Sequence, residues 1–184
     1  RMSRVDTAWL RMDNDVNLMM IVGVWLLTPA ITLPALRERV STRLLQYPRF
    51  RQKAQADASG AQWLDAQAFD LHHHVVPTAL DRDDGETDRQ ALQRLCGDLA
   101  TTALDPHRPL WQFHLVDGYE GGSALIARVH HCIGDGIALI SVMMSITDGG
   151  ASPPKRRKLH AEEDTDHDWL SDAVIKPLSD LAIK

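Results

Sequence analysis

Segments with the pattern of a strand and segments with the pattern of a helix alternate along this chain as far as about Asp148. The continuous apolar run from Leu18 to Leu27 has the length of a buried strand. Apolar residues then recur at three- and four-residue spacing from Leu33 to Leu44, which predicts an amphipathic helix capped by Thr32. This alternation indicates an α/β fold.

A second helix and a hairpin follow. Thr87 and Gln90 have the spacing of a capping box, and Leu92, Leu95, Leu99 and Ala103 line one helical face. The segment Leu110–Val116 alternates apolar and polar residues, with Gln112 and His114 on the polar side, and turn residues 117–122 lead into a return strand, Ser123–His131. Weaker strand candidates are Ala61–Leu64 and His73–Val76, and a last helix is expected at Ile137–Ile146.

Composition excludes several classes of protein. A net charge of −5 argues against sequence-independent binding of nucleic acid. Two cysteines cannot form a disulfide framework, which favours the cytoplasm. The uncharged stretch 16–36 is interrupted by threonines and prolines, and neither a basic segment nor a cleavage site precedes it. We therefore expect neither a membrane-spanning helix nor a signal peptide.

The character of the sequence changes near Gly149. We expect one domain at 1–148, a charged flexible linker at 149–168, and the start of an interdomain helix or crossover at 169–184. The Lys-Arg-Arg-Lys run at 155–158 is also compatible with a nuclear signal or a patch for anionic lipids, although a solvated linker is the simpler interpretation. A linker that leads into a new helix suggests that a second half follows.

The most informative motif is His130-His131-Cys132-Ile133-Gly134-Asp135-Gly136, where an apolar strand gives way to a helix. Neighbouring residues of a strand point to opposite faces, so one histidine should act and the other should support it. A neutral imidazole accepts a hydroxyl proton near neutral pH, which suits a general base. Asp135 can fix the local backbone or pair with an arginine such as Arg128, and Gly136 permits a tight turn.

Metal binding is the alternative for the histidines. His72, His73 and His74 form a compositional tract, but no Cys or His spacing resembles a structural zinc site. We expect no metal.

Taken with the other segments, the HHxxxDG string resembles the chloramphenicol acetyltransferase-like superfamily, and within it the bacterial wax ester synthase/acyl-CoA:diacylglycerol acyltransferase family. The resemblance covers about 3–148. It rests on the opening Ser3–Leu10, the PRFRQK stretch at Pro48–Lys53, the W…FD…HV pattern from Trp63 to Val75, and the RPLW element Arg108–Trp111. It implies an N-terminal half with a mixed β-sheet flanked by helices.

The resemblance also implies roles for individual residues. His131 would be the general base that deprotonates a lipid hydroxyl, which then attacks the thioester of acyl-CoA without an acyl-enzyme. Asp135 and His130 would be structural, Gly136 would permit the turn, and Pro109, Leu110 and Trp111 would pack near the site. Cys132 occupies a variable position of the motif and is not expected to be a nucleophile.

The expected function is O-acyl transfer from acyl-CoA to diacylglycerol or a long-chain alcohol, with acyl-CoA as co-substrate and no cofactor. The expected partners are those substrates, the missing C-terminal half and a membrane or lipid-droplet surface, with no nucleic acid. The location would be cytoplasmic or peripheral on the inner membrane or lipid inclusions. Two alternatives stay open, namely a condensation-type enzyme that uses carrier-bound thioesters and a non-catalytic half that serves as a binding module.

Overall fold

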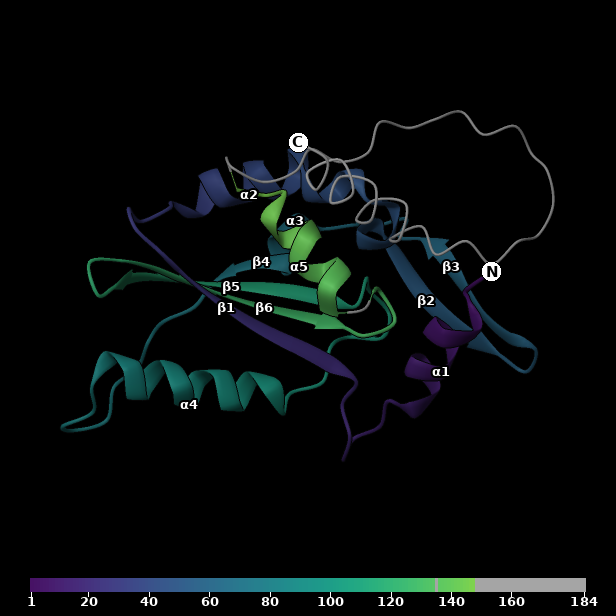
Figure 1. Cartoon of the computed structure of the whole chain (residues 1–184), viewed down its shortest axis with the longest axis horizontal. Coiled ribbons are helices and arrows are strands. Elements are labelled where there is room, and N and C mark those ends of the chain that lie inside the picture. Colours follow the sequence, from purple (N-terminus) through teal and green to yellow (C-terminus); the bar gives the residue numbers. More distant parts are fainter. Residues whose placement is uncertain (135, 148–184) are drawn as a thin grey trace, which may run out of the picture.

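The computed structural model describes residues 1–134 and 136–147. A four-stranded sheet forms the centre of the described part, in the order β1-β6-β5-β4 (Figure 1). Neighbouring strands are antiparallel except for β4, which runs parallel to β5, so the predicted α/β fold with a mixed sheet is confirmed. The strands of this sheet are β1 (Met20–Leu27), β4 (Val75–Pro77), β5 (Trp111–Tyr119) and β6 (Gly122–His130).

Helices cover both faces of the sheet, and a separate two-stranded ribbon lies beside α1 (Figure 1). The ribbon consists of β2 (Gln52–Asp57) and β3 (Gly60–Asp65). The helices are α1 (Arg4–Met12), α2 (Leu33–Thr42), α3 (Leu71–His74), α4 (Asp88–Ala100) and α5 (Gly136–Met144), with two 3₁₀ turns, η1 (Leu44–Gln46) and η2 (Pro48–Arg51).

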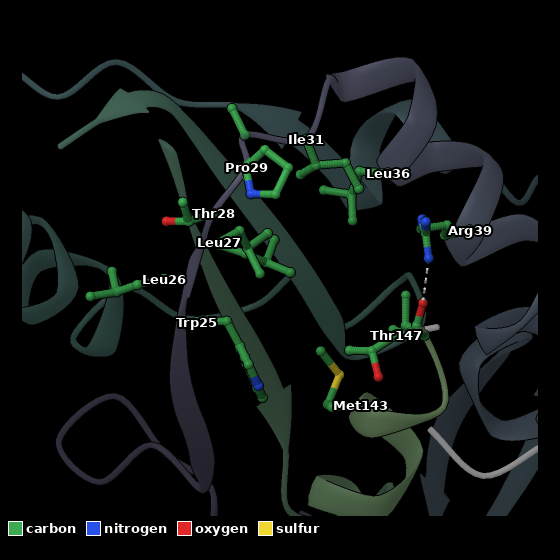
Figure 2. Close-up of a pocket in the computed structure, with 13 residues that line it drawn as sticks. Trp25, Leu26, Leu27, Thr28, Pro29, Ile31, Leu36, Arg39, Met143 and Thr147 are labelled. Atoms are coloured by element: carbon green, nitrogen blue, oxygen red, sulfur yellow. Dashed lines mark hydrogen bonds between the residues drawn. The ribbon is translucent and has the colours of Figure 1, made fainter. Parts of the chain in front are cut away.

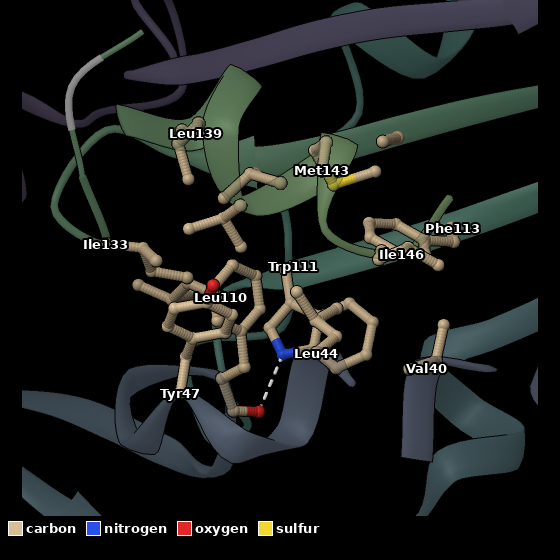
Figure 3. Close-up of a cluster of buried hydrophobic side chains, with 14 of the residues drawn as sticks. Val40, Leu44, Tyr47, Leu110, Trp111, Phe113, Ile133, Leu139, Met143 and Ile146 are labelled. Carbon is tan, nitrogen blue, oxygen red and sulfur yellow. Dashed lines mark hydrogen bonds between the residues drawn. The ribbon is translucent and has the colours of Figure 1, made fainter. Parts of the chain in front are cut away.

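The larger core lies between the sheet, α2, α5 and the two 3₁₀ turns (Figure 3). Trp111 is at its centre, packed edge-on against Phe50 and Phe113, and its Nε1–H donates to the Phe50 carbonyl over 2.8 Å. The indole thereby buries a large apolar surface and satisfies its one polar atom. This contact fixes the 3₁₀ turns against the start of β5.

The helix α4 covers the opposite face and begins at the predicted capping box. The Thr87 side chain accepts from the Gln90 N–H over 3.3 Å, and the Gln90 side chain accepts from the Thr87 N–H over 3.0 Å. Because α4 packs over Val116 and Ile126, this face of the sheet is also buried. The predicted alternation of β5 holds, and the side of the strand that carries His114 is buried as well.

The local predictions differ from the structure at one strand and miss two elements. The candidate strand His73–Val76 is shortened at its start, because Asp70 caps a helical turn that includes the histidines and accepts from the His72 N–H over 2.9 Å. The helix α1 and the strand β2 were not predicted. The predicted linker 149–168 and segment 169–184 lie outside the described residues.

Candidate active site

The two histidines of the motif separate where β6 ends. The His130 N–H donates to the Leu110 carbonyl over 2.9 Å, so His130 still belongs to the sheet. The His131 N–H instead donates to the Met19 carbonyl over 2.8 Å, and the Ile133 N–H closes a turn onto the His130 carbonyl over 3.0 Å. The sequence thus places one histidine in the strand and the next in the turn that follows it.

His130 is held as a neutral ring. Its side chain is 4% exposed, and its Nδ1 accepts from the Cys132 N–H over 3.0 Å. A neutral ring then carries its hydrogen on Nε2, which lies 3.6 Å from Asp13 Oδ1. Burial lowers the pKa of His130, and the Asp13 carboxylate only partly opposes this effect. This histidine is fixed and uncharged at neutral pH, as suits a supporting residue.

His131 is half-buried, and its ring stacks on Trp9 of α1. The ring centroids are 4.6 Å apart and the planes differ by 22°. Nδ1 is buried and has no hydrogen-bond partner among residues 1–134 and 136–147. Nε2 is therefore the nitrogen that can meet a substrate hydroxyl, which makes His131 the better candidate for a base.

The loop after the histidines is held by Arg49 of η2. Its guanidinium donates to the Ile133 carbonyl over 3.1 Å and forms an ion pair of 2.9 Å with Asp6 of α1. It also lies 5.2 Å from the centroid of the Trp63 ring. Residues from three of the family-like stretches, Asp6, Arg49 and Trp63, therefore meet behind the motif.

The other predicted residues fall into two groups. Leu110 and Trp111 are buried in the core, and Pro109 lies one residue before them. Asp135 lies outside the described residues, and Gly136 is the first residue of α5. The roles given to these residues stay predictions.

Arg128 is buried within the sheet, where it donates to Gln112 Oε1 over 3.2 Å and to the Thr102 carbonyl.

Cys132 does not have the surroundings of a nucleophile. Its side chain is fully buried, and burial raises the pKa of the thiol, so the reactive thiolate is disfavoured. Within the described part of the chain, no group of three or more Cys, His, Asp or Glu residues is arranged to hold a metal ion. The tract His72–His74 is divided, because His72 is exposed while His74 is buried between the Phe69 and Trp111 rings.

An apolar pocket of about 470 Å³ opens between the end of β1, α2 and the end of α5 (Figure 2). Trp25, Leu27, Ile31 and Met143 are among its lining residues, and Arg39 and Thr147 stand at one side. The register places Met20 opposite His130 and Leu27 opposite Ser123, so the pocket and His131 lie toward opposite ends of β1. A cavity of this volume with an apolar lining is typical of a site that binds an apolar group.

None of the helices in the described ranges is both long enough and apolar enough to cross a membrane.

Comparisons with known proteins agree on one family. The model of the wax ester synthase/diacylglycerol acyltransferase catalytic domain matches residues 2–181. A probable diacylglycerol O-acyltransferase of Mycobacterium tuberculosis, tgs3, is 32% identical over 162 residues, or 84% of this chain and 58% of that protein. Wax ester synthase/diacylglycerol acyltransferase 7 of Arabidopsis thaliana is 30% identical over 129 residues, or 69% of this chain and 26% of that protein.

Solved structures show the same fold. The wax ester synthase/diacylglycerol acyltransferase of Marinobacter aquaeolei VT8 superposes with a TM-score of 0.62 at 20% identity, covering 78% of this chain and 37% of that one. A starter condensation domain of rhizomide synthetase gives 0.64 at 12% identity, covering 79% and 36%. The expected chloramphenicol acetyltransferase-like fold is confirmed, and this chain spans only part of the length of these relatives.

Proposed function

This chain belongs to the wax ester synthase/diacylglycerol acyltransferase family, and we propose that it supplies the general base of an enzyme that transfers a fatty acyl group from acyl-CoA to diacylglycerol or a long-chain alcohol. The observation that best supports this proposal is the difference between the two histidines. His130 is buried, hydrogen-bonded and neutral, whereas His131 is half-buried and only its Nδ1 side is enclosed. In this proposal the complete enzyme contains a second half, uses acyl-CoA as its co-substrate and holds no resident cofactor.

In the proposed reaction, Nε2 of His131 takes the proton of the acceptor hydroxyl as its oxygen attacks the thioester carbonyl carbon. The tetrahedral intermediate collapses with cleavage of the carbon–sulfur bond, and the CoA sulfur leaves with the bonding electrons. The imidazolium returns its proton to that sulfur, so the products are an ester and free CoA thiol. No covalent acyl-enzyme forms, in keeping with the burial of Cys132.

The apolar pocket supports a long hydrocarbon substrate. The seven residues from Met20 to Leu26 of β1 span roughly 20 Å. We propose that the pocket holds the far end of a long acyl or alkyl chain whose reacting end lies at His131.

Replacing Ile31 by Trp at the pocket lining should lower the kcat/KM for palmitoyl-CoA about tenfold more than that for octanoyl-CoA. Val16→Trp, at a residue that is 96% exposed, is the control. An unchanged ratio of the two kcat/KM values contradicts this placement.

The central test measures thiol release from palmitoyl-CoA with hexadecanol or a diacylglycerol as acceptor. The intact mass and chain composition of the purified sample come first, because the proposal includes a second half. His131→Ala should lower the rate roughly 100- to 10,000-fold while the circular dichroism spectrum is unchanged. His72→Ala, the same change at an exposed histidine, should leave the rate as it is.

Three results overturn the proposal. A His131→Ala protein with full activity removes the general base from the mechanism. If the wild-type protein, with its second half present, binds acyl-CoA but releases no thiol, the chain is instead the non-catalytic binding module. Release of thiol only from carrier-bound acyl groups indicates a condensation-type enzyme, whose fold the chain shares at low sequence identity.

A further inference from the structure

We propose that α1 and its C-cap form a two-point clamp on the histidine pair, in which Trp9 orients His131 and Asp13 fixes His130. Both would be positioning residues, because they act through the histidines and not on the substrate. The inference rests on the proposed function and deepens it, since it says how the base is held.

The spacing in the sequence makes the clamp possible. Trp9 lies in the last turns of α1, and Asp13, four residues later, is its C-cap residue. The indole stacks on the His131 ring at 4.6 Å, and the carboxylate oxygen of Asp13 lies 3.6 Å from His130 Nε2. One short helix and its C-cap residue therefore reach both histidine side chains of the motif.

Asp13 also controls the backbone of the base. The same Oδ1 atom accepts from the Met19 N–H over 2.7 Å, and the Met19 carbonyl accepts from the His131 N–H over 2.8 Å. The carboxylate thus links the end of α1 to the start of β1 and, through it, to the turn that carries His131. Loss of this link would let the turn shift relative to His130.

Trp9 should matter most when His131 is charged. A base that has taken a proton is an imidazolium, and an aromatic face attracts a cation that lies over it. Other charged groups near the pair, among the described residues, are Asp13 at the end of α1 and the Asp6–Arg49 ion pair behind the loop. These groups stay in place when Trp9 is replaced, so a change in kcat reports on the indole.

The first experiment compares Trp9→Leu with Trp9→Phe in the acyl-transfer assay. The leucine variant should lose roughly 10- to 100-fold in kcat with KM values for both substrates unchanged, and the phenylalanine variant should recover most of that loss. Asp13→Asn should also lower kcat, whereas Asp15→Asn at the exposed neighbouring position should not. Combined with His131→Ala, neither Trp9→Leu nor Asp13→Asn should lower the residual rate further.

A second measurement is independent of turnover. The stacked indole of Trp9 should shift the NMR signal of the His131 ring Cε1–H upfield. Asp13→Asn should move that signal, because the ring is then displaced on the indole, whereas Asp15→Asn should not. An unchanged signal in Asp13→Asn together with an unchanged kcat in Trp9→Leu overturns the clamp. If the signal responds as expected but the wild type shows no acyl transfer with its second half present, the proposed function fails while the clamp stands.

Discussion

Mild acid should destabilise the folded chain through two buried histidines. His74 is 1% exposed, and its Nδ1–H donates to the Trp111 carbonyl over 2.7 Å. His114 is 8% exposed, and its Nδ1 lies 3.0 Å from Thr78 Oγ1. Burial lowers the pKa of each ring from 6.5 to about 4.

The sign and size of the effect follow from these pKa values. Between pH 6.5 and 4 the unfolded chain binds protons that the folded chain does not, so stability is complete above pH 6.5 and is lost as the pH falls toward 4. At pH 5.5 each histidine should cost about 1.4 kcal/mol of the free energy of unfolding. The lowered pKa of His130 acts in the same direction.

The assay is urea unfolding followed by tryptophan fluorescence at pH 7.5, 6.5 and 5.5. Near pH 5.5 the free energy of unfolding should fall by roughly 1 kcal/mol per pH unit for each histidine. The variant His74→Phe should lack the part of this pH dependence that comes from His74. The exposed His72→Phe is the matched control. The exposed carboxylates whose pKa is lowered respond only at lower pH, so this window isolates the histidines. A free energy of unfolding that is constant from pH 7.5 to 5.5 would refute the reasoning.

Two further predictions concern packing and reactivity. Gly122→Ala should cost about 1–3 kcal/mol of the free energy of unfolding, because a Cβ there would lie 2.2 Å from the Leu27 carbonyl oxygen. Gly97→Ala, on the open side of α4, should stabilise by roughly 0.5–1 kcal/mol, and urea midpoints of the two variants check both signs. Iodoacetamide should modify the native protein at the half-buried Cys96 and should reach Cys132 only after unfolding, as peptide masses would show; rapid native labelling of Cys132 would contradict its burial.

The sequence predicted the elements whose signals are local. The capping box of Thr87 and Gln90, the helix after Thr32 and the hairpin around Glu120 and Gly121 were all found, because each depends on residues close together in the chain. The burial of His114 could not be predicted, since alternation along β5 does not show that α4 covers that face. Burial on both faces is a property of the tertiary arrangement.

The site was predicted only in part. The HHxxxDG string and the family resemblance pointed to His131, but not to the contacts that hold it. Asp13 and Arg49 were missed as supports, because nothing in their spacing shows that a carboxylate at the end of α1 reaches His130, or that a guanidinium reaches the Ile133 carbonyl. Both lie within or just beyond the family-like stretches, so a search for charged residues there would have found them.

The pairing of β1 with β6 determines when the site is completed during synthesis. From Leu27 to Ser123, 96 positions separate the nearest paired residues of the two strands, so β1 leaves the ribosome long before its partner exists. Until then its apolar segment lacks the strand that later covers its edge, which is the condition under which chains aggregate or recruit chaperones. Contacts of such high sequence separation also form slowly. The base is therefore assembled only after the β5–β6 hairpin is made, and premature termination before residue 131 would release a chain with an unpaired β1 and no site.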